Sequence, residues 1–272
     1  MPEGHTIRRK VVDQSPYMVG RRLDVSSPNR RFSGGAALLD GRVLEDLDAW
    51  GKHLFYFFEG RRVLHVHLGM DGRFRHHRVT PGEVRRPGPG VWVRASSPDL
   101  TFDLSSPKKC EVIDVVHQRA LVAGLGPDPL RGDDGSAAFP RLAGRRDGIG
   151  EALLDQSLVA GIGNVYRAEI LFAHGMHPER PAATLTAGEW QDLWGTATRM
   201  LEAGVRDRGE IRTVGPRDLK VRDGRQVYVY GQRMCAHCGS PVRRWDLAGR
   251  VAYACETCQP PWPAASRPVV SR

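Results

Sequence analysis

The stretch "DQSLVAGIGNVYRAEILF", residues 155–172, gives the clearest local signal for the fold. Gly161 and Gly163 interrupt a helical pattern, and Asn164 is suited to cap the helix that follows. A glycine-rich turn that leads into a helix N-terminus presents backbone N–H groups and the positive end of the helix dipole, which together favour a phosphate. The alternative is an ordinary helical hairpin in which the two glycines only form the turn.

Four of the five cysteines form two Cys-x2-Cys pairs on the C-terminal side of this stretch, Cys235–Cys238 and Cys255–Cys258. Each pair places two thiolates at one turn, and two such turns can complete a tetrahedral zinc site. A redox pair is the alternative, but thioredoxin-like chemistry uses one such motif in a βαβ setting. The spacing therefore predicts one structural Zn²⁺. The fifth cysteine, Cys110, is predicted to be a small buried hydrophobic residue.

On the N-terminal side, short apolar runs separated by Gly, Pro and Asp replace the helical pattern. We expect a helix over residues 3–19, then strands at 53–58, 62–68, 91–95, 100–104 and 111–116. Several short strands at this spacing favour an antiparallel sandwich or barrel. The Gly/Pro/Asp-rich segment 124–140 is typical of an interdomain linker. A further helix is expected near 187–203, with its Trp residues in the core and Gly204 at its end.

The composition favours a globular protein that binds a polyanion. The 272 residues include 40 Lys and Arg against 31 Asp and Glu, a formal net charge of +9, and 40% are hydrophobic. Nucleic acid is the commonest partner for such a surplus, and a solvated surface is the alternative. The sequence contains no run of about 18 apolar residues and no signal-peptide pattern, so we expect no membrane association and a cytoplasmic location.

Two further stretches carry candidate functional residues. The chain begins "MPEGHT", and removal of Met1 would leave the secondary amine of Pro2 beside the carboxylate of Glu3. An α-amino group has a pKa of about 7.7–8.0, so much of it is neutral and nucleophilic at physiological pH. In "WGKHLFYFFEGRRVLHVHLGMDG", residues 50–72, Lys52 is a phosphate contact or a plain strand-edge charge. Met70 is an exposed apolar wedge or a core residue.

The combination of these motifs is more specific than any one of them. The Pro-Glu start, "WGKHLF", "HVHLGM", "DQSLVAGIGNVYR" and a four-cysteine segment with "GRVAYACETCQ" occur in this order over essentially the whole chain. Together they resemble the formamidopyrimidine-DNA glycosylase and endonuclease VIII family of base-excision repair enzymes, and are most similar to its actinobacterial endonuclease VIII branch.

The resemblance implies an α+β multidomain fold. It comprises an N-terminal antiparallel β-sandwich with an N-terminal helix, a helix-two-turn-helix domain and a C-terminal zinc β-hairpin, with DNA bound between the two halves. The expected boundaries are a catalytic β-sandwich at 1–126, a linker at 127–148, the helical domain at 149–216, the zinc hairpin at 217–260 and a disordered tail at 261–272.

The resemblance also implies a role for each candidate residue. Pro2 would be the nucleophile and Glu3 the general acid and base, with Lys52 and Arg250 completing the catalytic set through phosphates. Asn164 would hold a phosphate beside the flipped nucleotide, and Met70 would enter the base stack. These roles, with Gly161 and Gly163 in the DNA-binding turn, imply a DNA glycosylase with abasic-site lyase activity that acts through a Schiff base and β,δ-elimination.

The substrate expectation rests on two departures from the purine-specific pattern of the family. Gly4-His5-Thr6 follows Pro2-Glu3 where Leu-Pro-Glu is usual, and "SSPKKCEV" at 105–112 lacks the usual Arg-Phe pair. Oxidised pyrimidines are therefore favoured over oxidised purines, in double-stranded and also in single-stranded DNA, by a monomeric enzyme. The alternatives are a preference for oxidised purines, cleavage of abasic sites and single strands with little base excision, and a non-catalytic zinc-containing protein that binds damaged DNA.

Overall fold

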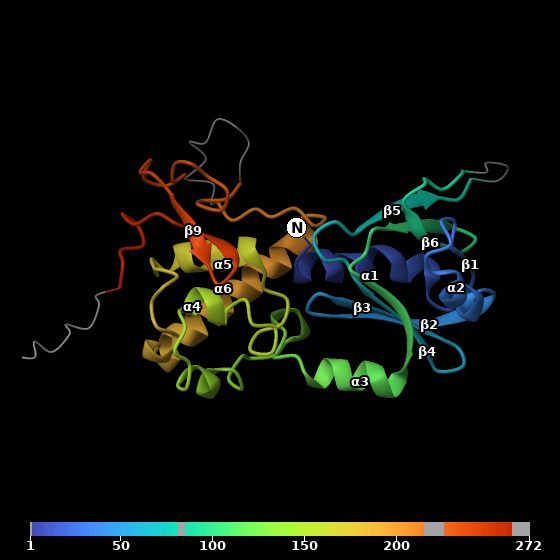
Figure 1. Cartoon of the computed structure of the whole chain (residues 1–272), viewed down its shortest axis with the longest axis horizontal. Coiled ribbons are helices and arrows are strands. Elements are labelled where there is room, and N and C mark those ends of the chain that lie inside the picture. The colour runs from blue at the N-terminus through green and yellow to red at the C-terminus, as the bar shows by residue number, and fades with distance from the viewer. Residues whose placement is uncertain (1, 81–84, 215–225, 263–272) are drawn as a thin grey trace, which may run out of the picture. The chain divides into compact units, whose positions relative to one another are not determined.

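The computed structural model describes residues 2–80, 85–214 and 226–262 (Figure 1). The chain divides into two compact units, Met1–Leu125 (unit 1) and Gly126–Arg272 (unit 2). Residues 217–225 of the predicted zinc hairpin and 263–272 of the predicted tail lie outside the described residues. The domain boundaries expected from the sequence stay predictions. Within the described ranges, every helix is too short or too polar to cross a membrane.

The described residues of unit 1 form antiparallel strands and three helices. The predicted N-terminal helix and the five predicted strands are confirmed, although Val115 and Val116 begin a helix instead of ending a strand. Asp114 explains this difference, because its carboxylate accepts a hydrogen bond from the backbone N–H of His117 (2.7 Å) and caps that helix. The elements are α1 Gly4–Met18, β1 Arg22–Ser26, α2 Ser33–Leu39, β2 Arg42–Trp50, β3 His53–Phe58, β4 Arg62–His67, β5 Arg73–Arg78, β6 Val91–Ser96, β7 Leu100–Ser105, β8 Lys109–Asp114 and α3 Val115–Ala123.

The strands of unit 1 follow the order β5-β7-β6-β1-β2-β3-β4-β8, and every neighbouring pair is antiparallel. Strands β1 and β2 pair only at Arg22–Val43 and Leu23–Arg42, so this short pairing joins two four-stranded halves. Helix α1 contacts β2 and β3 of one half and β7 of the other (Figure 1). Both halves therefore share one hydrophobic core, to which α1 contributes Ile7, Val11 and Met18.

Unit 2 is mainly helical and carries a C-terminal β-hairpin. Its elements are η1 Pro129–Arg131, η2 Phe139–Leu142, α4 Ile149–Ala152, α5 Asn164–Ala173, η3 Ala182–Thr184, α6 Ala187–Arg206, β9 Arg243–Leu247 and β10 Arg250–Ala254. Helix α6 buries Trp190 and Trp194 against the core, as predicted. It does not end at Gly204, which is buried within it. The chain turns at Arg208 and Gly209, where φ is +57° and +90°.

The segment 127–148, predicted as a linker, is packed into unit 2. Ala138 and Leu142 are buried in its core. The indole Nε1–H groups of Trp190 and Trp194 donate to the carbonyls of Gly135 (2.9 Å) and Asp133 (2.8 Å). Gly135 has a φ of +73°, and a Cβ there would lie 2.2 Å from the ring of Trp194. The glycine at position 135 therefore lets the backbone of this segment pack closely against α6. A local sequence pattern does not reveal this contact.

Candidate functional site

The beginning of α1 places a buried carboxyl group one residue after Pro2. Glu3 is the N-cap residue of α1 and forms a capping box with Thr6, in which the N–H of Glu3 donates to Thr6 Oγ1 (3.4 Å). Glu3 is 0% exposed and Pro2 is half-buried. The positive end of the helix dipole favours a carboxylate at this position. The sequence "PEGHT" thus forms a helix start that holds a buried carboxyl group one residue from Pro2.

Lys52 lies in the turn between β2 and β3. Trp50 pairs with His53, so Gly51 and Lys52 are the two residues of a tight hairpin loop. Gly51 has a φ of +55°, a conformation that favours glycine. Lys52 is half-buried at this turn, directly before the first residue of β3.

A chain of imidazoles beside Lys52 was not predicted from the sequence. His65 Nδ1 lies 2.9 Å from Glu111 Oε1, and His65 Nε2 lies 2.9 Å from His53 Nδ1. Because the carboxylate only accepts, His65 donates from Nδ1 and accepts from His53 at Nε2. Burial lowers the pKa of His53 to about 3 and that of His67 to about 4, and neighbouring histidines and lysines add to the effect. These rings are therefore neutral near pH 7. In the sequence, the alternating His residues of "HVH" (65–67) are the only indication that imidazoles share one face of this strand.

The loop from Leu68 to Gly72 presents Met70 to solvent. The Met70 side chain is 66% exposed, an unusual state for a large apolar residue. Gly69 has a φ of +67°, and a Cβ there would lie 2.7 Å from Lys108 Cβ. The Lys108 N–H also donates to the Leu68 carbonyl (3.3 Å). The Met70 loop therefore packs against the 105–112 segment.

In unit 2, Asn164 and Arg250 lie on two elements that are hydrogen-bonded together. Asn164 Nδ2 and Arg167 Nη2 both donate to the Val251 carbonyl, at 3.0 and 2.8 Å. Val251 follows Arg250, the first residue of β10. The predicted role of Asn164 as N-cap is wrong, because Gly163 is the N-cap residue of α5. The Asn164 amide is directed to the hairpin instead, and its Oδ1 is buried without a hydrogen-bond partner.

The β9–β10 hairpin exposes Arg250 at its tip. Leu247 pairs with Arg250 across a two-residue turn in which Ala248 and Gly249 have φ values of +50° and +74°. Positive φ at both positions is typical of a type I′ turn. Asp246 Oδ1 accepts from the Gly249 N–H (3.1 Å), which supports the turn.

The glycine-rich turn before α5 is closed by its own side chains. Gly161 has a φ of +93°, and its N–H donates to Gln156 Oε1 (3.1 Å). Gln156 Nε2 donates in turn to the carbonyls of Leu154 and Ile162, both at 2.9 Å. The Gly161 N–H thus stabilises the turn through its bond to Gln156. The positive φ of Gly161 allows the backbone to adopt this turn.

A buried carboxylate on α5 was also missed by the sequence interpretation. Glu169 is 0% exposed. It accepts hydrogen bonds from the Thr213 hydroxyl (2.6 Å) and from the N–H groups of Tyr228 (2.7 Å), Val229 (3.0 Å) and Tyr230 (2.9 Å). Burial raises the pKa of Glu169, and the four hydrogen bonds oppose that effect. Glu169 thereby fixes the segment that leads into the first cysteine pair. A charged residue on an apolar helix was the available signal.

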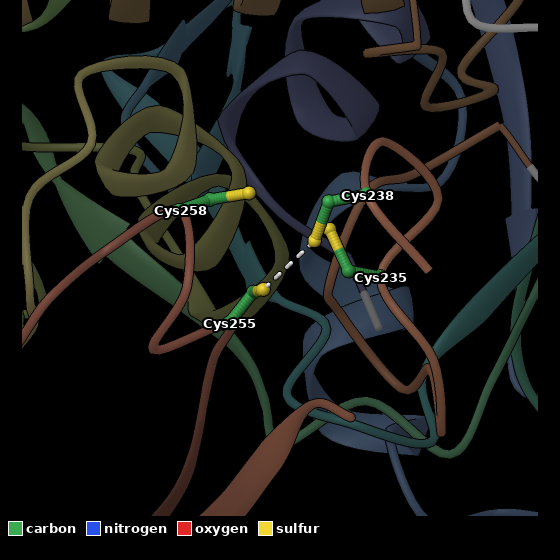
Figure 2. Close-up of side chains that lie close together, drawn as sticks. All are labelled: Cys235, Cys238, Cys255 and Cys258. Atoms are coloured by element: carbon green, nitrogen blue, oxygen red, sulfur yellow. Dashed lines mark hydrogen bonds between the residues drawn. The ribbon is translucent and has the colours of Figure 1, made fainter. Parts of the chain in front are cut away.

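The four cysteines converge as their spacing predicts (Figure 2). Their Sγ atoms all lie within 4.8 Å of one another, and those of Cys238 and Cys255 are 3.5 Å apart. A tetrahedral zinc site with Zn–S distances of about 2.3 Å places its sulfurs about 3.8 Å apart, so this arrangement fits the metal. Among the described residues, no other group of His, Cys, Asp or Glu could hold a metal ion. The fifth cysteine, Cys110, packs against the core of unit 1, and burial raises its pKa to about 12.

The predicted site residues are divided between the two units. Unit 1 carries Pro2, Glu3, Lys52 and Met70, and unit 2 carries Gly161, Gly163, Asn164, Arg250 and the four cysteines. Within unit 2, the structure brings Asn164 and the Arg250 hairpin together through Val251. Within unit 1, it brings the Met70 loop and the 105–112 segment together through Lys108.

Comparison with known proteins identifies the same family in both units. Residues 1–115 match the formamidopyrimidine-DNA glycosylase N-terminal domain, and residues 125–214 match the H2TH domain of the same enzymes. Endonuclease 8 1 of Mycobacterium tuberculosis is 39% identical over 268 residues, which cover 95% of this chain and all of that protein. The probable endonuclease 8 2 of Streptomyces coelicolor is 35% identical over 272 residues, which cover 95% of this chain and 94% of that protein.

Solved structures agree with this fold. One is the formamidopyrimidine-DNA glycosylase of Lactococcus lactis in a complex with DNA that contains an abasic site. It superposes on this chain with a TM-score of 0.78 at 23% sequence identity, and the match covers 95% of this chain and all of the Lactococcus lactis chain. The α+β fold expected from the sequence is thereby confirmed, with its antiparallel sheet, helical domain and four-cysteine cluster. The chain therefore belongs to the formamidopyrimidine-DNA glycosylase and endonuclease VIII family of base-excision repair enzymes, whose members are DNA glycosylases with abasic-site lyase activity.

Proposed function

We propose that this enzyme excises oxidised pyrimidines from DNA through an N-terminal proline Schiff base and then cleaves the strand by β,δ-elimination. The observation that carries the proposal is the start of α1, where the fully buried carboxyl group of Glu3 adjoins Pro2. Removal of Met1 exposes the Pro2 amine. Burial of Glu3 excludes water from the one titratable side chain that adjoins this nucleophile in sequence.

The chemistry uses the two groups in sequence. The lone pair of the neutral Pro2 nitrogen attacks the deoxyribose C1′, the bond from C1′ to the damaged base breaks with its electron pair passing to the base, and the base leaves with the proton that the Pro2 nitrogen loses. Opening of the sugar ring then gives an iminium ion between Pro2 and C1′. The cation acidifies the C2′ proton, so the 3′ phosphate leaves by β-elimination and the 5′ phosphate follows by δ-elimination. Hydrolysis of the remaining iminium frees the Pro2 amine.

Glu3 is proposed as the general acid and base of these steps. It donates a proton to the sugar ring oxygen as the ring opens and accepts one from C2′ during elimination. A stacked nucleotide does not expose its C1′ to the enzyme, so the lesion must first leave the duplex. Met70, exposed on its loop, is proposed to fill the space that the lesion vacates.

Contacts with the backbone hold the extruded nucleotide. Lys52, Asn164 and Arg250 are proposed to bind phosphates, and the exposed position of Arg250 on a rigid hairpin tip supports this role. Zinc is proposed as the metal of the four-cysteine cluster, where it would hold the base of that hairpin. The DNA complexes among the related solved structures, including one with an abasic site, further support the proposed partner.

The preference for pyrimidines is tested by a panel of oligonucleotides that carry thymine glycol, 5-hydroxycytosine, dihydrouracil, 8-oxoguanine or an abasic site, each in duplex and single-stranded form. We expect single-turnover excision to be faster for the three pyrimidine lesions than for 8-oxoguanine opposite cytosine. The reverse order would establish the purine preference instead. Cleavage of the abasic site alone would limit the enzyme to lyase activity, and binding without cleavage of any substrate would refute the enzymatic proposal.

A further inference from the structure

A hollow of about 490 Å³ lies on the sheet of unit 1, away from the Pro2–Glu3 start of α1 in sequence. It is lined by residues of β5, β6 and β7 and by the segment from Arg85 to Gly90. It also borders two loops already described, because Arg73 directly follows the Met70 loop and Ser105 and Ser106 begin the 105–112 segment. The hollow therefore begins three residues after Met70 in the chain, on the strand that directly follows the Met70 loop.

Strand periodicity concentrates positive charge on this face. Alternate residues of a strand share one face, so Arg73, Arg75 and His77 of β5 lie together while Phe74 packs on the core. Both arginines are exposed, and β5 is the edge strand of the sheet. Two more exposed arginines, Arg85 and Arg86, line the hollow from the neighbouring segment.

A buried ion-pair network orders the wall of the hollow. Asp103 of β7 is 4% exposed, and both of its oxygens accept hydrogen bonds from Arg94 of β6, at 2.7 Å each. Arg94 also donates to the Arg85 carbonyl. His77 Nδ1 lies 2.7 Å from Arg85 Nη1, and His77 Nε2 lies 3.3 Å from Asp103 Oδ2. Because a guanidinium only donates, the His77 proton lies on Nε2, towards Asp103. Arg85 is thus held at both its backbone and its side chain.

The charges of the lining residues do not cancel. Among the described residues that line the hollow, Asp103 has the only carboxylate, and Arg94 already offsets it through two hydrogen bonds. Four arginines therefore face one hollow whose described lining has no other acidic group. Guanidinium groups bind phosphate oxygens in a bidentate manner, which makes phosphate the ligand class that fits.

We infer that this arginine hollow (Arg73, Arg75, Arg85 and Arg86) binds backbone phosphates of the DNA beyond the lesion itself. The inference rests on the proposed function, since the hollow borders the loop that carries Met70. The contact is made to phosphates and to no base, so it strengthens binding to damaged and undamaged duplexes alike. A free phosphate compound offers the same chemistry, and the experiment separates the two sources.

The test measures Kd for a duplex with an uncleavable tetrahydrofuran abasic-site analogue over a series of salt concentrations. The variants are Arg73→Gln/Arg75→Gln and, independently, Arg86→Gln, all at exposed positions where folding is expected to persist. Each phosphate contact contributes roughly 0.9 to the slope of log Kd against log salt. We expect the slope to fall by about 2 units in the double variant and by about 1 in Arg86→Gln. The same fall is expected on an undamaged duplex.

The matched control is Arg119→Gln, which should leave the slope unchanged. Arg119 lies on α3 beside β8, at the opposite end of the strand order from β5.

Unchanged slopes in both variants would overturn the inference. Calorimetric titration with inorganic pyrophosphate gives the second arm. Binding of pyrophosphate by the wild type and not by the double variant, with unchanged DNA slopes, would assign the hollow to a free phosphate compound and also overturn the inference. Failure of the wild-type protein to cleave any abasic-site duplex would refute the proposed function instead, and the salt slopes would still report on the hollow.

Discussion

Two glutamates, one in each unit, are both fully buried and yet are held in different ways. Glu169 of α5 accepts four hydrogen bonds, from the Thr213 hydroxyl and three consecutive backbone amides. Glu3 belongs to a capping box at the start of α1, with Pro2 as its neighbour. Burial alone therefore does not distinguish the carboxylate that we propose to be catalytic from the structural one. The two differ in their neighbours, since Glu3 directly follows Pro2 in the chain, whereas Glu169 accepts its hydrogen bonds from residues 213 and 228–230 of its own unit.

The difference also concerns what each carboxylate supports. Glu169 fixes residues 228–230, which lead into the cysteine pairs and the hairpin with Arg250. Glu3 supports one turn of α1, which the large core of unit 1 holds in any case. Substitution of Glu169 should therefore reduce stability, whereas substitution of Glu3 should reduce activity.

The largest expected effect is loss of the zinc proposed for the four-cysteine cluster, which lies at the base of the hairpin that carries Arg250. Structural zinc in small motifs contributes roughly 10–16 kcal/mol of binding free energy at pH 7. Removal by a chelator, or the substitution Cys255→Ser, should unfold the hairpin and abolish DNA cleavage. Elemental analysis together with a nicking assay checks this. Active protein that contains no zinc would contradict the assignment.

Substitution of the two glutamates gives the next largest effect. Glu169→Ala leaves the N–H groups of residues 228–230 without their acceptor, while the Thr213 hydroxyl keeps the Gln226 carbonyl, so the free energy of unfolding should fall by about 3 kcal/mol or more. Glu3→Gln keeps the shape of the helix cap and should cost about 1 kcal/mol or less. Urea denaturation of both variants measures the difference. Equal losses of stability would show that the two carboxylates have the same structural function.

Activity should show the opposite order. Glu3→Gln keeps the Pro2 amine but removes the group that transfers protons, so base excision should be lost. Some cleavage at an existing abasic site should persist, because that substrate needs no assistance to the departing base. A Glu3→Gln protein with wild-type excision of thymine glycol would remove Glu3 from the mechanism.

A smaller effect is expected at the hairpin tip that Glu169 indirectly supports. Arg250→Gln should weaken binding to every duplex and reduce the salt slope by about 1 unit, as for one lost phosphate contact. Asn164→Ala should also weaken binding, and the Val251 carbonyl would keep its hydrogen bond from Arg167. Fluorescence anisotropy at several salt concentrations measures both. An unchanged slope for Arg250→Gln would place that residue outside the DNA contact.

Sequence patterns predicted the elements whose signal is local. The helix of residues 4–18, five strands of unit 1 and the convergence of the four cysteines follow from periodicity and spacing. Strand β5, "RFRHHR", was missed because it is an edge strand with arginine and histidine on its outer face. A pattern of alternating apolar residues cannot reveal such a strand.

Tertiary contacts explain the other differences. Asn164 has the composition of a helix cap, but its amide donates to Val251, 87 residues away in sequence. The segment 127–148 has the composition of a linker, but Gly135 and Asp133 accept hydrogen bonds from the Trp residues of α6. The sequence shows Glu169 as a charged residue on an apolar helix but does not show what it binds, because its partners lie 44 to 61 positions further along the chain. Long-range partners of this kind follow from the fold and not from local pattern.

Borohydride trapping tests the central claim, that Pro2 is the nucleophile, most directly. Reduction of the iminium during reaction with abasic-site DNA should give a covalent protein–DNA adduct whose DNA is attached to the Pro2 nitrogen, as peptide mass spectrometry can determine. Protein with a C-terminal tag and Met1 removed should form the adduct. Protein with an N-terminal tag left in place should not, because an acylated nitrogen has no lone pair free to attack. An adduct at any other residue, or full glycosylase activity in the N-terminally blocked protein, would contradict the account.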